Sequence, residues 1–259
     1  TAEVCDGVDN DANGIIDDVD EGGDGICDCL NIGTIGTIGP WSTGGDIFKE
    51  WLDTRSPIGA TELGDEVITP ELIAGLQVIV VLRVDTAPLD VDSTPAHHEF
   101  SAAEVDALDE WVRAGGSLMT TIGYQGDETA EVQNVNRLLA PFDLGYLDSG
   151  DALNLGGFIT NWKTHAISNG VSSINTDNGV SPDPTNGNAI AWDSADRTAM
   201  VVAKADSGRV IVFGDEWITY DSEWEDLETQ QVELLWLNMF KWMSPAEVCQ
   251  VEIPPILID

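Results

Sequence analysis

From Cys29 onward, short apolar runs alternate with segments that have the amphipathic period of a helix. The run Val78 to Val84 has the composition of a fully buried strand, and Ser117 to Ile122 forms the next such run. Between them, Ser101 and Glu104 form a capping box at the start of a helical pattern. This alternation is typical of a mostly parallel sheet covered by helices on both faces, so it predicts an α/β fold.

The remaining elements are predicted from the same periodicities. Further strands are expected at Leu30 to Ile38, Ala60 to Leu63, Phe158 to Thr160, Ala189 to Trp192, Ala199 to Ala205 and Arg209 to Phe213. Further helices are expected at Asp46 to Leu52, from Pro70 after a Thr69 cap, at Val132 to Leu139 and at Glu228 to Met243. Residues 206–208 would join the last two strands as a hairpin. A βα series with a late hairpin predicts a flavodoxin-like, three-layer sandwich.

The composition divides the chain into three segments. We expect residues 1–28 to form an acidic loop segment, residues 29–244 the α/β domain, and residues 245–259 a C-terminal tail. The tail is apolar but interrupted by proline, which suits an edge strand or an arm laid on another surface. A neighbouring copy would supply that surface, so we expect a homo-oligomer or another extracellular assembly partner.

Residues 9–20 read DNDANGIIDDVD and match the twelve-residue calcium-loop template position by position. Gly14 occupies the position where the chain must turn sharply, and Ile16 is the apolar anchor. The predicted Ca²⁺ ligands are the side chains of Asp9, Asp11, Asn13, Asp17 and Asp20 and the backbone carbonyl of Ile15.

The end of the loop departs from the template, because Asp20 replaces the usual Glu and reaches less far. Glu21 is an alternative closing ligand. The competing interpretation is a solvated acidic turn without metal. Such a turn has no need of a glycine and an aliphatic residue at these offsets, and its clustered carboxylates would repel one another.

The cysteines lie only at the two ends of the chain, at Cys5, Cys27, Cys29 and Cys249. A bond between Cys27 and Cys29 would need a strained ring, so Cys5 is expected to pair with one of them and Cys249 with the other. Reduced thiols or a zinc site are the alternative, but the spacing does not match that of structural zinc sites. The chain begins at Thr1, as a processed secreted protein or a trimmed one does, and we expect it to be extracellular.

The chain carries 47 Asp and Glu against 10 Lys and Arg, which gives a net charge of −37. This charge opposes binding to nucleic acids and to anionic membrane surfaces. The longest uninterrupted apolar run is far shorter than the roughly 20 residues that span a bilayer, so membrane insertion is not expected.

The N-terminal stretch CDGVDNDANGIIDDVDE resembles the Cys-Asp-Gly, Asp-Asn-Asp, Asp-Gly motif that recurs in secreted proteins of myxobacteria and their relatives. Its short closing acid is also similar to the loops of dockerins and thrombospondin type 3 repeats. The resemblance implies a secreted calcium-binding module. Ala12 stands where the motif usually carries a second Cys, so the local disulfide of that family is not expected here.

Three segments of the α/β domain resemble class I glutamine amidotransferase-like domains: HAISNGV at His165 to Val171, GRVIVFGDE at Gly208 to Glu216, and NMFKWM at Asn238 to Met243. Catalytic members of that family carry a Cys nucleophile on a turn after a central strand. The corresponding turn here begins at Gly123 and reads GYQG, and this domain has no Cys after Cys29. The resemblance therefore implies a non-catalytic member that acts as a binding or assembly module.

Acidic side chains follow several of the predicted strands, where open α/β sheets bind ligands. They lie at Asp85, in residues 123–127, and at Asp215 and Glu216. Such acids could catalyse glycoside hydrolysis or hold a second cation, although a chain with 47 acids brings carboxylates together by coincidence.

The histidines and surface aromatics offer weaker candidates. His97 and His98 are expected to be solvated rather than metal ligands, and His165 to make a structural hydrogen bond. Trp217 to Trp224, with Tyr220 between them, could stack on sugar rings, but packing beneath the last helix is the favoured interpretation.

The sequence thus predicts a secreted, calcium-binding, non-enzymatic α/β protein that acts as a structural or interaction subunit of a cell-surface or extracellular assembly, for which a filament is one candidate form. The alternatives are a calcium-dependent polysaccharide hydrolase and a carbohydrate-binding module.

Overall fold

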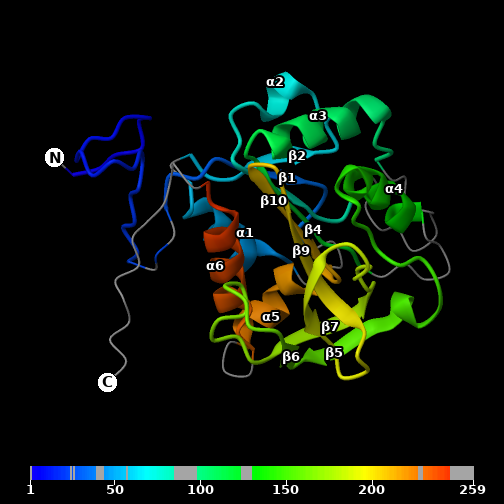
Figure 1. The fold of residues 1–259 in the computed structure, drawn as a ribbon. Helices are drawn as coiled ribbons and strands as arrows, with labels where there is room; N and C mark the ends of the chain where they lie inside the picture. The colour runs from blue at the N-terminus through cyan, green and yellow to red at the C-terminus, as the bar shows by residue number, and fades with distance from the viewer. Residues whose placement is uncertain are drawn as a thin grey trace.

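The computed structural model describes residues 2–23, 25, 27–38, 44–56, 58–84, 98–123, 130–226 and 230–245. Its centre is an eight-stranded sheet with the order β2-β1-β3-β4-β10-β9-β8-β6 (Figure 1). The first five strands in this order are parallel: β2 (Thr61–Gly64), β1 (Ile32–Ile35), β3 (Val78–Val81), β4 (Ser117–Thr120) and β10 (Gly208–Phe213). The other three are antiparallel: β9 (Thr198–Ala205), β8 (Asn188–Trp192) and β6 (Asn161–Trp162).

Helices cover both faces of the sheet (Figure 1). One face packs against α1 (Asp46–Asp53), α5 (Asp221–Glu225) and α6 (Val232–Met243). The other face packs against α2 (Pro70–Ile73), α3 (Ala102–Arg113) and α4 (Ala130–Leu139). Successive residues of β3 alternate between the two cores, which is why its sequence is apolar throughout.

Smaller elements complete the fold. A separate two-stranded antiparallel sheet joins β5 (Leu155–Ile159) and β7 (Ile174–Gly179). Among the described residues, short 3₁₀ helices lie at η1 (Ala140–Phe142), η2 (Gly150–Asn154) and η3 (Glu216–Thr219). None of the helices in the described part of the chain is long and apolar enough to span a membrane.

The predicted helix starts are confirmed in two cases by cap geometry. The side chain of Thr69 accepts a hydrogen bond from the N–H of Leu72 at 3.3 Å. Ser101 accepts from the N–H of Glu104, and the Glu104 carboxylate accepts in return from the N–H of Ser101. These two bonds are the predicted capping box.

The α/β class with a mostly parallel sheet and a late β9–β10 hairpin is confirmed. The boundaries differ at several places. The first strand is only Ile32–Ile35, and α6 begins at Val232 rather than at Glu228. Strand β7 was missed because its sequence INTDNG is mostly polar and ends in a turn-forming pair.

A disulfide fastens the N-terminal segment to the residue that precedes the first apolar stretch of the domain. Cys5 pairs with Cys29, with a Cα–Cα separation of 5.4 Å. Cys27 is also disulfide-bonded, and there is no free cysteine among the described residues. Cys249, the partner left for Cys27 in the sequence prediction, lies outside them, as does the predicted C-terminal arm.

Candidate functional site

The N-terminal acidic segment, defined as residues 2–23, is organised by carboxylates that accept hydrogen bonds from the backbone. Asp9 accepts from the N–H groups of Asn13 and Gly14, at 3.1 and 2.9 Å. Gly14 has a φ of 94°, in the left-handed region that favours glycine, so the turn expected at this position is present. The loop therefore curls around the side chain of its first residue.

Three carboxylates from different parts of this segment come together. Glu3, Asp11 and Asp18 each offer one oxygen, and these oxygens lie within 4.8 Å of one another. The Oδ1 atom of Asp18 is buried and has no hydrogen-bond partner among the described residues. Carboxylates this close repel one another unless a cation or a proton neutralises them, and carboxylate oxygens are the ligands that calcium takes.

The structure brings one predicted metal ligand, Asp11, into this cluster. The other predicted side chains accept backbone hydrogen bonds, from Gly14 to Asp9, from Ile15 to Asn13, from Gly7 to Asp17 and from Gly25 to Asp20. Sequence reasoning missed Glu3 because it precedes the twelve-residue template, and Asp18 because it occupies a position that the template does not use. Calcium binding by the ligand set of the twelve-residue template stays a prediction.

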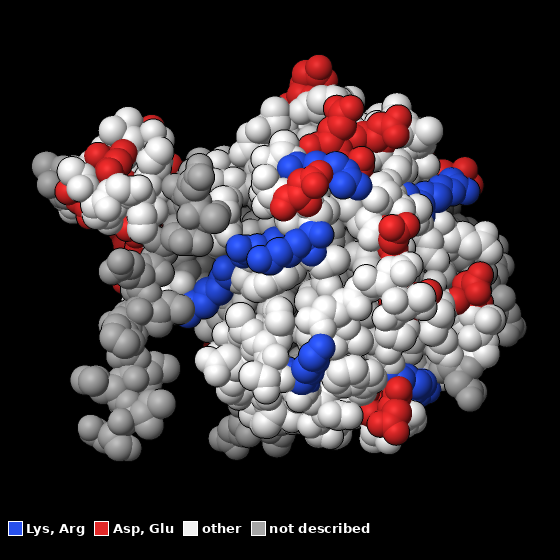
Figure 2. All heavy atoms as spheres, viewed as in Figure 1, with Lys and Arg blue, Asp and Glu red and all other residues white. Residues whose placement is uncertain are grey.

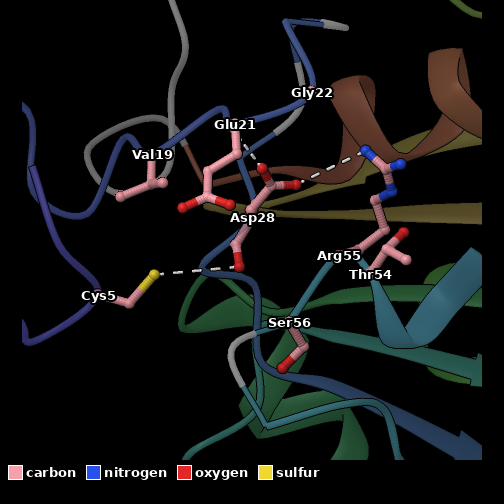
Figure 3. Close-up of a pocket in the computed structure, with 8 residues that line it drawn as sticks. All are labelled: Cys5, Val19, Glu21, Gly22, Asp28, Thr54, Arg55 and Ser56. Atoms are coloured by element: carbon pink, nitrogen blue, oxygen red, sulfur yellow. Dashed lines mark hydrogen bonds and ion pairs between the residues drawn. The ribbon is translucent and has the colours of Figure 1, made fainter.

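A cavity of about 480 Å³ lies between the acidic segment and the end of α1 (Figure 3). Asp28 lines this cavity. Its carboxylate accepts a hydrogen bond from the N–H of Glu21 at 2.7 Å and lies 3.6 Å from the guanidinium of Arg55. Arg55 also covers the Trp51 ring, 5.1 Å from its centroid. The cavity is thus a junction where charged side chains tie the acidic segment to the α/β domain.

A second pocket, of about 340 Å³, lies at the carboxyl ends of β4 and β10. It is lined by Gly123, Asp177, Asn178, Asp215, Glu216, Trp217 and Tyr220. The sequence predicted two of its acids, Asp215 and Glu216, as strand-end candidates. Asp85 and residues 124–127, the other predicted strand-end candidates, lie outside the described residues.

Asp215 is fully buried and uses both carboxylate oxygens within the fold. Its Oδ2 accepts from the N–H of Asp177 at 2.6 Å and its Oδ1 from the N–H of Trp217 at 3.0 Å. Burial raises the pKa of Asp215 well above its ordinary value, although these two hydrogen bonds favour the ionised form. The side chain therefore joins β7 to η3, and it is closed off from the pocket's solvent.

Glu216 is also buried, next to Arg83 and Tyr220. The Tyr220 hydroxyl donates to Glu216 Oε1 at 3.1 Å, and the Arg83 guanidinium lies 3.8 Å from the same oxygen. Burial and the neighbouring Glu216 raise the pKa of the Tyr220 hydroxyl. Gly123 has no side chain because a Cβ atom there would collide with the Glu216 carboxylate.

The two tryptophans proposed as sugar-stacking residues have different surroundings. Trp217 lines the strand-end pocket and stacks on Tyr220, with ring centroids 4.7 Å apart. Trp224 is buried, and its ring packs against Phe48 and Trp51 beneath the helices of that face. Sugar stacking is therefore wrong for Trp224, whose favoured interpretation, packing, is confirmed.

Two of the histidines lie within the described residues. The His98 ring is half-buried and contacts Glu104 Oε1 at 2.9 Å, so the prediction that it is solvated is wrong. His97 lies outside the described residues. His165 Nδ1 accepts from the N–H of Ile167 at 3.2 Å, which confirms a structural hydrogen bond.

Comparison with known proteins identifies the fold of this chain. No protein-family model and no curated protein matches its sequence. A solved structure of the cytoplasmic protein STM1381 from Salmonella typhimurium LT2 is similar, with 16% identity, a TM-score of 0.61, and coverage of 83% of this chain and 100% of that chain. The mmIFT52 N-terminal domain matches with 15% identity, a TM-score of 0.62, and coverage of 86% and 100%. The cytoplasmic protein STM3548 from Salmonella typhimurium matches with 13% identity and a TM-score of 0.58 over 83% and 100%. At these identities the likeness shows a shared α/β architecture alone.

Proposed function

We propose that this chain is a calcium-stabilised, non-enzymatic α/β subunit of an extracellular or cell-surface assembly. The proposal of calcium binding rests on the close approach of the Glu3, Asp11 and Asp18 carboxylates within the acidic segment. The segment is fastened to the domain by the Cys5–Cys29 disulfide, so an ion bound there would stabilise a region joined covalently to the fold. Disulfides persist in oxidising compartments, which supports the extracellular location.

The strand-end acids Asp215 and Glu216 are already engaged in hydrogen bonds and an ion pair within the fold, which favours a binding role over hydrolysis. A glycoside hydrolase needs one carboxyl group free to protonate the leaving group and another facing the sugar. Asp215 instead accepts two backbone hydrogen bonds, and Glu216 is buried beside Arg83 and Tyr220. The carbohydrate-binding alternative rests on Trp217 alone, and one face of that ring is stacked on Tyr220.

The proposal includes a flavodoxin-like arrangement of the domain. If the five parallel strands are numbered by their order in the chain, they lie side by side across the sheet as 2-1-3-4-5. This is the strand order of the flavodoxin-like doubly wound sheet. The resemblance to non-catalytic amidotransferase-like domains stays a prediction from the sequence motifs.

The test of calcium binding is thermal unfolding with and without the ion. We expect CaCl₂ to raise the Tm of the wild-type chain and EDTA to reverse the rise, because a ligand selective for the folded state stabilises it by mass action. At calcium concentrations 100 times the Kd, the gain is about 2.7 kcal/mol. Isothermal titration calorimetry would measure the Kd directly.

Two variants separate the two ligand sets. Asp9→Asn removes a carboxylate of the template alone, and Asp18→Asn removes a carboxylate of the observed cluster alone. The variant with the larger loss of calcium affinity identifies the set that binds the ion. Asp148→Asn, a change to an exposed acid of the α/β domain, is the matched control. An unchanged wild-type Tm in CaCl₂, together with no heat of binding, would refute the calcium proposal.

A further inference from the structure

The few cations of this acidic chain are unevenly distributed. Four of its ten Lys and Arg residues belong to what we call the basic patch, which consists of Lys163, His165, Lys204, Arg209, Lys241 and Trp242. Figure 2 shows Lys and Arg side chains extending across the middle of this face, with Asp and Glu side chains mostly towards its rim.

Contacts between elements bring these residues together. The Arg209 guanidinium lies 5.4 Å from the centroid of the Trp242 ring, and the His165 ring is 5.6 Å from it. Arg209 pairs in register with Lys204 across the β9–β10 hairpin, so their side chains share one face of the sheet. Lys241 precedes Trp242 in the last turn of α6.

Lys163 extends the patch towards β8. Its Nζ donates to Asn188 Oδ1 at 2.6 Å, and Asn188 pairs with Val202, two residues before Lys204 on β9. Residues two apart on a strand face the same way, so Lys163 approaches the side of the sheet that carries Lys204.

The cations of the patch have no carboxylate partner among the described residues, whereas five of the six cations outside it have one. Five cations elsewhere each form an ion pair with Asp or Glu: Lys49, Arg55, Arg83, Arg113 and Arg197. Within the described residues, no carboxylate lies within 4.0 Å of the charged nitrogens of Lys163, Lys204, Arg209 or Lys241. In a chain with 47 acids, a group of four unpaired cations is a surface that a separate acidic partner can neutralise.

The basic patch is better suited to binding an acidic partner than to stacking on a sugar ring. Arg209 covers the Trp242 ring, and His165 packs against it edge-to-face. A sugar ring would need that aromatic face to be open, whereas a carboxylate-rich polypeptide needs only the cations.

We propose that the basic patch docks the N-terminal acidic segment of a second copy of this chain. That segment, residues 2–23, carries eight Asp and Glu residues and no Lys or Arg. It lies at one edge of the molecule, beside the sheet and its helices rather than among them (Figure 1). The inference rests on the assembly role in the proposed function, and it names a second copy as the partner and the two surfaces that meet.

The contact is head-to-tail, because the patch and the acidic segment are different surfaces. Such a contact leaves one patch and one segment unused in every dimer, so it propagates into a ring or an open filament. Two copies with a charge of −37 repel at long range, but the Debye length of about 8 Å at physiological ionic strength screens distant charges more than contacting ones.

The test compares oligomer size by sedimentation velocity in CaCl₂ for three variants. Lys204→Glu/Lys241→Glu reverses two patch charges, and Lys49→Glu/Arg137→Glu makes the same change in net charge outside the patch. Asp6→Lys/Val8→Lys reverses one charge and adds one positive charge in the acidic segment, at two exposed residues outside both candidate ligand sets. Circular dichroism and the calcium-dependent shift in Tm show that each variant is folded.

We expect the wild type and the Lys49→Glu/Arg137→Glu control to assemble. The patch variant and the segment variant should each be monomeric, with the dissociation constant raised about tenfold or more, as expected when a contacting charge is lost. An equimolar mixture of these two variants should associate, because the mixture joins one intact patch to one intact segment.

Three outcomes would overturn the proposal. Assembly of the patch variant to the same size as the control refutes the patch and leaves the proposed assembly role standing. A wild-type chain that is monomeric at every concentration refutes the docking between copies and leaves an assembly with a different partner standing, while calcium stabilisation is judged separately by the Tm. Patch-dependent binding of a polyuronate by a monomeric chain would identify a glycan as the occupant instead.

Discussion

At the scale of single residues, the buried acids of this chain are structural. Glu104 is buried at the start of α3 and accepts from the N–H groups of Ile68 and Ser101, at 3.0 and 2.8 Å, and contacts His98. Burial disfavours its ionised form, but these hydrogen bonds outweigh burial and lower the pKa of Glu104 below its ordinary value. One carboxylate thus joins the loop before α2, the cap of α3 and a histidine.

The change Glu104→Gln should destabilise the chain by about 1–3 kcal/mol at pH 7, because one oxygen becomes an NH₂ group that faces the N–H and hydroxyl of Ser101. Since the pKa of Glu104 is lower in the folded than in the unfolded chain, the ionised group stabilises the fold above the unfolded pKa. This contribution is lost as the pH falls through the folded pKa. Urea unfolding of both proteins between neutral and acidic pH should show the difference narrowing below about pH 4.5.

Glu110→Gln is the matched control, because Glu110 lies exposed on the same helix. It should leave the unfolding free energy within about 0.5 kcal/mol of the wild type. Equal effects of the two substitutions, or a pH-independent difference for Glu104→Gln, would contradict this account of the capping box.

At the scale of elements, the acidic segment behaves as an attachment to the sheet. Its own hydrogen bonds run mostly from backbone N–H groups to carboxylates, as for Asp9 and Asp17, rather than between strands. It is held to the domain by the Cys5–Cys29 disulfide, by the bond from the N–H of Asp28 to the carbonyl of Val19, and by the Asp28–Arg55 ion pair. Calcium and the disulfide are therefore expected to act on the same local structure.

Removing that disulfide with Cys5→Ser/Cys29→Ser should weaken calcium binding, because the segment must then be ordered by the ion alone. A disulfide that closes a loop of this size contributes about 3 kcal/mol by the chain-entropy argument. Calorimetric titration gives the change in Kd, and limited proteolysis without calcium should show faster cleavage within residues 2–23. Val8→Ser, an exposed change in the same segment, should leave both unaltered. Wild-type affinity in the double Ser variant would show that the segment is ordered without its disulfide.

At the scale of the whole molecule, the charge of −37 opposes the compact state. The ion pairs of the described residues use only a small part of the 47 acids, so most carboxylates repel one another across the surface. Screening should relieve this repulsion.

We expect the Tm of the calcium-free chain to rise as NaCl increases from about 0.01 to about 0.1 M, over which the Debye length falls from about 30 to about 10 Å. Differential scanning calorimetry in EDTA measures the effect. The Asp9→Asn and Asp18→Asn variants serve as controls, because a similar rise in both excludes sodium bound at the calcium site as the cause. A Tm that falls with NaCl would mean that attractive pairs, rather than repulsion, dominate the surface.

The sequence by itself determined the α/β class, the order of most elements and the two helix caps at Thr69 and Ser101, because these depend on local periodicity and on hydrogen bonds within a few residues. It also limited Cys5 to two partners, and the tertiary structure selected Cys29. Only the tertiary structure brought Glu3 and Asp18 to Asp11, turned Asp215 into a buried acceptor of backbone hydrogen bonds, and placed Arg209 over the Trp242 ring. These arrangements join residues far apart in the chain, and their burial and charge depend on neighbours that no local pattern records.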